Sequence, residues 1–209
     1  MSSLRTIPLI LTAAVVFWSA VSDLCAQEGD SIDRAGESAP IRFRWEGGAE
    51  GYMPVDEDRQ ISTINFNASL GIPLWRKVEL WLYGGLTATF AWGEIKRESE
   101  NSPDTTLENS AAGLGPFLMA RWTPLTFDRL SLSLIASEGI ILNSGNFPAG
   151  RDIYNFMGRL GADVVVQIER ALLMNVGIRW MHVSNGQGLG TFNPSYDGLG
   201  FALSLSGGW

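Results

Sequence analysis

The chain has 209 residues, a length typical of one domain, with 15 basic and 22 acidic residues and a formal net charge of −7. This acidic balance argues against nucleic acid as a partner, because polyanions bind basic surfaces. One histidine and one cysteine exclude an intramolecular disulfide and form a poor ligand set for a metal, so we expect neither a metal site nor a cofactor.

The N-terminus has the features of an exported protein. Residues 1–26 predict a cleaved secretory signal: Arg5 supplies the positive charge, a mostly apolar stretch follows, and Ala26 offers a cleavage site, with an earlier cut as the alternative. Residues 27–40 are polar and aperiodic, so we expect a flexible lead before a folded domain over residues 41–209.

From residue 41 onward, apolar residues alternate with polar or small ones, which is the period-two pattern of β-strands. The second segment shows it clearly, since Ile64, Phe66 and Leu70 alternate with asparagine and serine. The pattern predicts eight strands, over residues 41–53, 61–74, 78–95, 107–122, 129–142, 154–168, 172–185 and 197–209. Pro116 falls inside the fourth strand, where it cannot donate a ladder hydrogen bond, so we expect a bulge or local irregularity there.

The polar faces and the joints favour one architecture. Short joints alternate with longer ones at 54–60, 97–106, 143–153 and 185–196, as in membrane barrels with short periplasmic turns and long outer loops. We therefore predict an all-β fold, an eight-stranded antiparallel transmembrane β-barrel of the bacterial outer membrane, with a soluble β-sandwich as the alternative. Ionisable residues that recur on the polar faces are expected to pair in the narrow lumen. They are Arg42, Arg44, Glu46, Glu79, Arg121, Arg159, Asp163 and Arg179.

The sole histidine lies near the end of the seventh predicted strand. Even-numbered residues such as Trp180 form the lipid-facing row of that strand, and His182 and Ser184 continue this row. Asp197 has the parity of the lipid-facing row of the eighth strand, and it begins that strand beside the end of the seventh. We therefore expect all three polar residues on the outside of the barrel, near the outer membrane interface.

These residues offer a nucleophile, a base and an orienting acid. An Asp197–His182 pair would fix the imidazole tautomer, which leaves the other ring nitrogen to take a proton from Ser184. Asn185 and the flexible Gly186 and Gly188 could supply hydrogen-bond donors for an oxyanion. Each residue alone also has an ordinary interpretation, as an interface anchor, a strand serine, a strand start or a turn. Their shared face and height favour a catalytic site.

The motif His182-x-Ser184-Asn185, followed by a glycine-containing loop and by Asp197 on the last strand, resembles the PagL family of outer-membrane lipid A deacylases. The resemblance implies that Ser184 is the nucleophile, His182 the base and Asp197 the acid, with Asn185 and a loop amide at the oxyanion hole. Two positions depart from the family pattern: glycine follows Asn185 where alanine is usual, and Ser195, two residues before the acid, stands where glycine is usual.

The same resemblance implies a reaction and its partners. The reaction is hydrolysis of the ester that holds the 3-hydroxyacyl chain at position 3 of lipid A. Lipid A or lipopolysaccharide would be the substrate, and outer membrane lipids would surround the barrel. A non-enzymatic small barrel for adhesion or membrane integrity is the alternative function. A pore is disfavoured, because side chains fill the lumen of an eight-stranded barrel.

Overall fold

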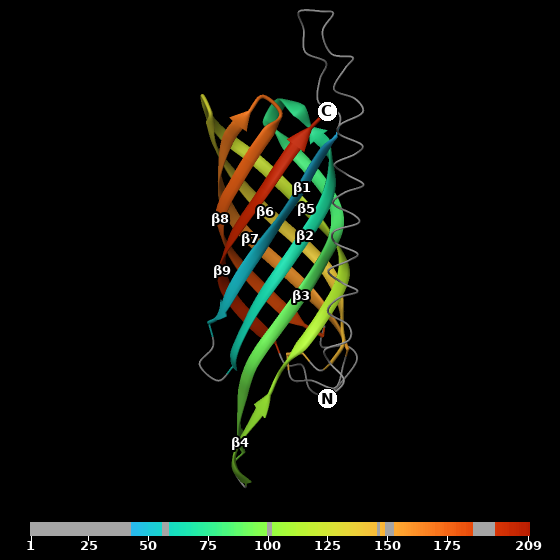
Figure 1. Cartoon of the computed structure of the whole chain (residues 1–209), viewed down its shortest axis with the longest axis vertical. Coiled ribbons are helices and arrows are strands. Elements are labelled where there is room, and N and C mark those ends of the chain that lie inside the picture. The colour runs from blue at the N-terminus through green and yellow to red at the C-terminus, as the bar shows by residue number, and fades with distance from the viewer. Residues whose placement is uncertain (1–42, 56–58, 100–101, 146, 149–152, 186–194) are drawn as a thin grey trace, which may run out of the picture.

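The computed structural model of this chain describes residues 43–55, 59–99, 102–145, 147–148, 153–185 and 195–209. It forms an eight-stranded antiparallel closed β-barrel, as the sequence predicted (Figure 1). The expected signal peptide and the lead at 27–40 lie outside the described residues. Among the described residues, no helix is long and apolar enough to cross a membrane.

Nine strand segments build the barrel wall. They are β1 (Arg44–Pro54), β2 (Arg59–Trp75), β3 (Leu80–Ser99), β4 (Ser102–Glu108), β5 (Ala111–Phe127), β6 (Leu130–Asn143), β7 (Tyr154–Glu169), β8 (Leu172–Ser184) and β9 (Tyr196–Gly208), with the 3-10 helix η2 (Arg76–Val78) between β2 and β3. β4 and β5 pair with successive parts of β3, so together they fill one position in the wall. β1 pairs with β9, which closes the barrel and leaves the wall without an open edge.

The two ends of the barrel differ. We call the end with the connections at 76–79, 128–129 and 170–171 the short-turn end, and the opposite end the long-loop end. The long joint expected at 97–106 is wrong, because β3 and β4 continue as a hairpin that projects beyond the long-loop end (Figure 1). The residues of this hairpin are mostly polar, so they show no alternation from which strands could be predicted.

A bulge or local irregularity was expected at Pro116, and the structure has the irregularity without the bulge: Gly115 and Pro116 have no register partner on β6. Pro116 keeps its register with Leu86 on β3, and the β5–β6 pairs before and after it follow one register. The register shift of β5 lies instead between Trp122 and Leu125, at Pro124. A proline removes one ladder donor at either place, but a missing donor does not by itself require an extra residue in the strand.

Large apolar side chains point outward along the wall. The exposed ones include Phe66, Leu118, Leu134, Val176 and Phe201, and polar or small residues between them face the lumen. Such a belt would be unfavourable in water and suits the hydrocarbon of a bilayer. The belt confirms the outward rows that alternation predicted, including the even-numbered row of β8.

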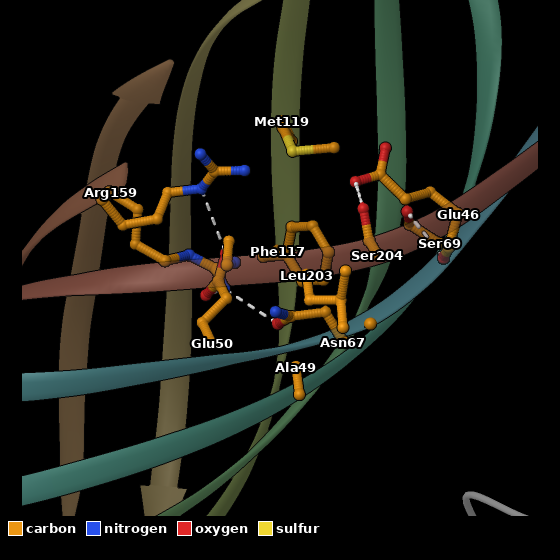
Figure 2. A pocket seen from close by; sticks show the side chains of 13 residues that line it. Glu46, Ala49, Glu50, Asn67, Ser69, Phe117, Met119, Arg159, Leu203 and Ser204 are labelled. Carbon is orange, nitrogen blue, oxygen red and sulfur yellow. Dashed lines mark hydrogen bonds and ion pairs between the residues drawn. The ribbon is translucent and has the colours of Figure 1, made fainter. Parts of the chain in front are cut away.

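Buried side chains joined through ion pairs fill the middle of the lumen, and the pairing was predicted. These pairs are Arg121–Glu46 (2.7 Å), Arg121–Asp163 (2.6 Å), Arg179–Asp163 (2.6 Å), Arg159–Glu50 (2.9 Å) and Arg179–Glu50 (3.4 Å). Glu50 was absent from the predicted set, and Arg42 lies outside the described residues. A space of about 20 Å³ remains among these pairs, hardly more than one water molecule needs. Figure 2 shows Glu50 and Arg159 among the side chains that line it.

Candidate active site

The antiparallel register of β8 and β9 places His182 directly opposite Asp197. Both side chains lie on the outward face near the long-loop end, in the row that contains Trp180 and Leu199. His182 Nδ1 lies 3.0 Å from Asp197 Oδ1, and the two side chains are 38% and 37% exposed. The predicted pair is therefore formed, and a molecule outside the barrel can reach it.

This hydrogen bond determines which ring nitrogen can act as a base. An ionised carboxylate only accepts hydrogen bonds, so Nδ1 of His182 carries the proton that it donates to Asp197. The neutral imidazole then presents Nε2 with a free lone pair. That arrangement allows Nε2 to accept a proton from a hydroxyl, which is the task of a general base in ester hydrolysis.

Trp180 supports the same imidazole from a second direction. The rings of Trp180 and His182 are stacked, with centroids 5.9 Å apart and planes inclined by 22°. Alternation placed Trp180 in the outward row, but it did not reveal this contact, because stacking depends on side-chain rotamers. The position two residues before His182 on the same strand face was the available signal.

Ser184 is the last residue of β8 and is half-buried. It shares the outward parity of His182, and its register partner on β7 is Phe156. Among the described residues, its hydroxyl forms no hydrogen bond with His182 or Asp197, which bond to each other. The structure thus brings His182 and Asp197 into contact and places Ser184 next along the row, since residues two apart on a strand are roughly 7 Å apart at Cα.

The predicted oxyanion donors are only partly described. Asn185 follows β8 and is 3% exposed, so it is buried where Ser184 is not. Gly186 and Gly188 lie outside the described residues. Within the described part of the chain, no group of three or more histidine, cysteine, aspartate and glutamate side chains could hold a metal ion.

Comparisons with known proteins concern the fold. No family model matches the sequence, and no curated protein matches it. A crystal structure described as the outer membrane enzyme PagL is similar, with a TM-score of 0.54 and 17% identity over 76% of this chain and 97% of that chain. A solid-state NMR structure of the outer membrane protein AlkL in lipid bilayers has a TM-score of 0.37 and 11% identity over 85% and 95% of the two chains, too low to add to the argument. This chain thus shares the barrel fold of PagL.

Proposed function

We propose that this protein is a lipid A deacylase that hydrolyses the ester-linked 3-hydroxyacyl chain at position 3 of lipid A. The observation that carries this proposal is the His182–Asp197 hydrogen bond on the outer, apolar face of a barrel, with Ser184 next in the same row. The His182-x-Ser184-Asn185 motif and the likeness of the fold to the enzyme PagL support it.

The proposed location is the cell outer membrane, which the chain reaches through a cleaved N-terminal signal peptide. The exposed apolar belt would contact lipid, with the short-turn end in the periplasm and the long-loop end outside. His182 and Asp197, near the long-loop end, would then lie at the level of the outer leaflet. Lipid A carries its acyl esters at that level, so it would approach the site laterally.

The proposed reaction proceeds in two steps. His182 Nε2 accepts the proton of Ser184 while Oγ of Ser184 attacks the ester carbonyl, and the sugar oxygen leaves with the proton that His182 returns. Water then attacks the acyl-serine in the same manner, which releases the 3-hydroxy fatty acid and restores Ser184. Asp197 stabilises the imidazolium in both steps. Asn185, Gly186 and Gly188 are the proposed donors to the oxyanion.

Mass spectrometry of lipid A from cells that express each variant tests the proposal. The wild-type protein should remove one 3-hydroxyacyl chain, and Ser184→Ala or His182→Ala should leave lipid A intact, because each removes a group that moves a proton or forms the acyl bond. Ser62→Ala is the matched control: Ser62 lies on β2, outward and near the same end of the barrel, and its variant should remain active.

A folded wild-type barrel that leaves lipid A unchanged would contradict the proposal. That result would favour the non-enzymatic barrel, whose function would lie in the segments beyond the long-loop end. Heat-modifiable electrophoretic mobility reports the folded barrel in each sample, so a loss of activity is not confused with a loss of assembly.

A further inference from the structure

Glu138 is an acidic residue in an outward, apolar row. It lies on β6 between exposed residues such as Leu134 and Ile140, and it is itself exposed. A carboxylate that faces lipid acyl chains is unfavourable, and ionisable residues within membrane-spanning segments commonly mark a functional site. The proposed mechanism assigns Glu138 no part.

The register of the sheet connects Glu138 to the candidate site. Glu138 pairs with Gly158 on β7, and Gly158 pairs in turn with His182 on β8. A Cβ atom built on Gly158 would lie 3.0 Å from Oε2 of Glu138. The carboxylate therefore lies over the bare backbone of β7, between its own strand and the strand of His182.

An outward groove of about 450 Å³ contains Glu138 and Gly158. Its other lining residues include Leu82, Leu118, Ala120, Ala136, Leu160 and Trp180. Ala120 and Ala136 are register partners, so small side chains on neighbouring strands leave room between larger ones. Because Trp180 also stacks on His182, the groove adjoins the candidate site.

The lining of the groove fits a ligand that has both a hydrocarbon chain and a hydrogen-bond donor. Its apolar lining suits a hydrocarbon chain. Within the described part of the chain, the Glu138 carboxylate forms no ion pair and no hydrogen bond, so it offers an unused acceptor in lipid surroundings. A donor on the occupant would satisfy this acceptor, and hydrogen bonds to charged groups are the stronger ones.

We infer that Glu138 is a specificity-determining residue that accepts a hydrogen bond from the 3-hydroxyl of the acyl chain being released. This inference rests on the proposed function of Ser184 and His182. The 3-hydroxyl is separated from the ester carbonyl by one methylene, so it lies close to the reacting bond, and the remaining hydrocarbon extends along the groove. A plain acyl chain leaves the carboxylate without a donor, so the site discriminates against it.

Binding to the Ser184→Ala protein in lipid nanodiscs tests the inference without any hydrolysis. The probes are the methyl esters of 3-hydroxytetradecanoic acid and of tetradecanoic acid, titrated calorimetrically against empty nanodiscs as the blank. We expect the hydroxylated ester to bind at least about tenfold more tightly. Adding Glu138→Leu should remove this preference, and adding Glu138→Gln, which keeps an acceptor oxygen, should retain part of it.

Ile140→Ala is the matched control for Glu138→Leu, and two results would contradict the inference. Leucine suits an outward row, so Glu138→Leu should assemble, and Ile140→Ala in the same row but outside the groove should keep the preference of its parent. Equal binding of both esters by the Ser184→Ala protein, or an unchanged preference after Glu138→Leu, would overturn the inference. A hydroxyl preference in a protein whose wild type hydrolyses no ester would support the Glu138 site and contradict the proposed function.

Discussion

His182 is held by two unlike neighbours on one face of the sheet. Asp197 binds its Nδ1 from the adjacent strand at 3.0 Å, and Trp180 stacks on its ring from the same strand. The first contact selects the tautomer, and the second restricts rotation of the imidazole. Both contacts reduce the reorganisation that proton transfer from Ser184 would otherwise require.

Asp197→Asn should lower kcat for 3-hydroxyacyl release by about 10²- to 10⁴-fold with little change in KM, because an amide neither stabilises the imidazolium nor enforces the tautomer. Asp197→Glu keeps the charge and should retain more activity than Asp197→Asn. Initial rates on purified lipid A in detergent give both constants. Near wild-type rates for Asp197→Asn would show that Asp197 has only a structural role at the start of β9.

At the scale of elements, the β8–β9 hairpin determines the site, since its register pairs His182 with Asp197. The outward row of β8 continues from this pair toward the short-turn end through Ile178 and Val176, which are 57% and 45% exposed. Hydrocarbon must solvate these residues in a bilayer. The same row therefore carries both the His182–Asp197 pair and the apolar contacts that would keep it at a defined depth.

Val176→Lys should destabilise the barrel by about 2–4 kcal/mol, because Val176 pairs with Val164 and Leu203 in the middle of the wall, where a charge faces hydrocarbon. Leu74→Lys, close to the short-turn end of β2, should cost about 0–1 kcal/mol. Urea unfolding in lipid vesicles, followed by tryptophan fluorescence, measures both. Equal losses of unfolding free energy for Val176→Lys and Leu74→Lys would contradict an apolar belt that spans the bilayer.

Alternation in the sequence predicts the face of each residue but not the alignment of strands that are not joined by a hairpin. The parity of His182, Ser184 and Asp197 placed them outside, because each strand has one apolar face. Parity cannot show that Glu138 on β6, Gly158 on β7 and His182 on β8 lie side by side across the sheet. That alignment depends on the stagger between strands. The β3–β4 hairpin was missed for a related reason: beyond the barrel, no apolar belt imposes an alternating pattern.

At the scale of the whole molecule, five ion pairs inside the barrel form one connected network. Asp163 joins Arg121 and Arg179, and Glu50 joins Arg179 and Arg159, so each buried cation shares an acid with another. These contacts link residues from β1, β5, β7 and β8 across the interior. The network therefore ties opposite parts of the wall together and leaves little space at its own level, whereas a cavity of about 270 Å³ lies toward the short-turn end.

Asp163→Asn should destabilise the barrel by about 3–5 kcal/mol, because it leaves Arg121 and Arg179 buried with less compensating charge. Glu79→Gln is the matched control, since the Arg44–Glu79 pair is 3.7 Å long and its glutamate side chain is 50% exposed. That change should cost about 0–1 kcal/mol. Unfolding midpoints in vesicles give the comparison, and similar midpoint shifts for the two variants would argue against the network.

Every residue proposed for the bond-breaking step belongs to the final hairpin of the chain, β8 and β9, or to the segment between them. Before that hairpin pairs, His182 and Asp197 are separate residues in an unfolded polypeptide, and neither orients the other. If the proposed function holds, the chain would therefore have no hydrolase activity before the barrel assembles. Competence for the proposed reaction would arise at the moment of assembly, in the membrane that holds the substrate.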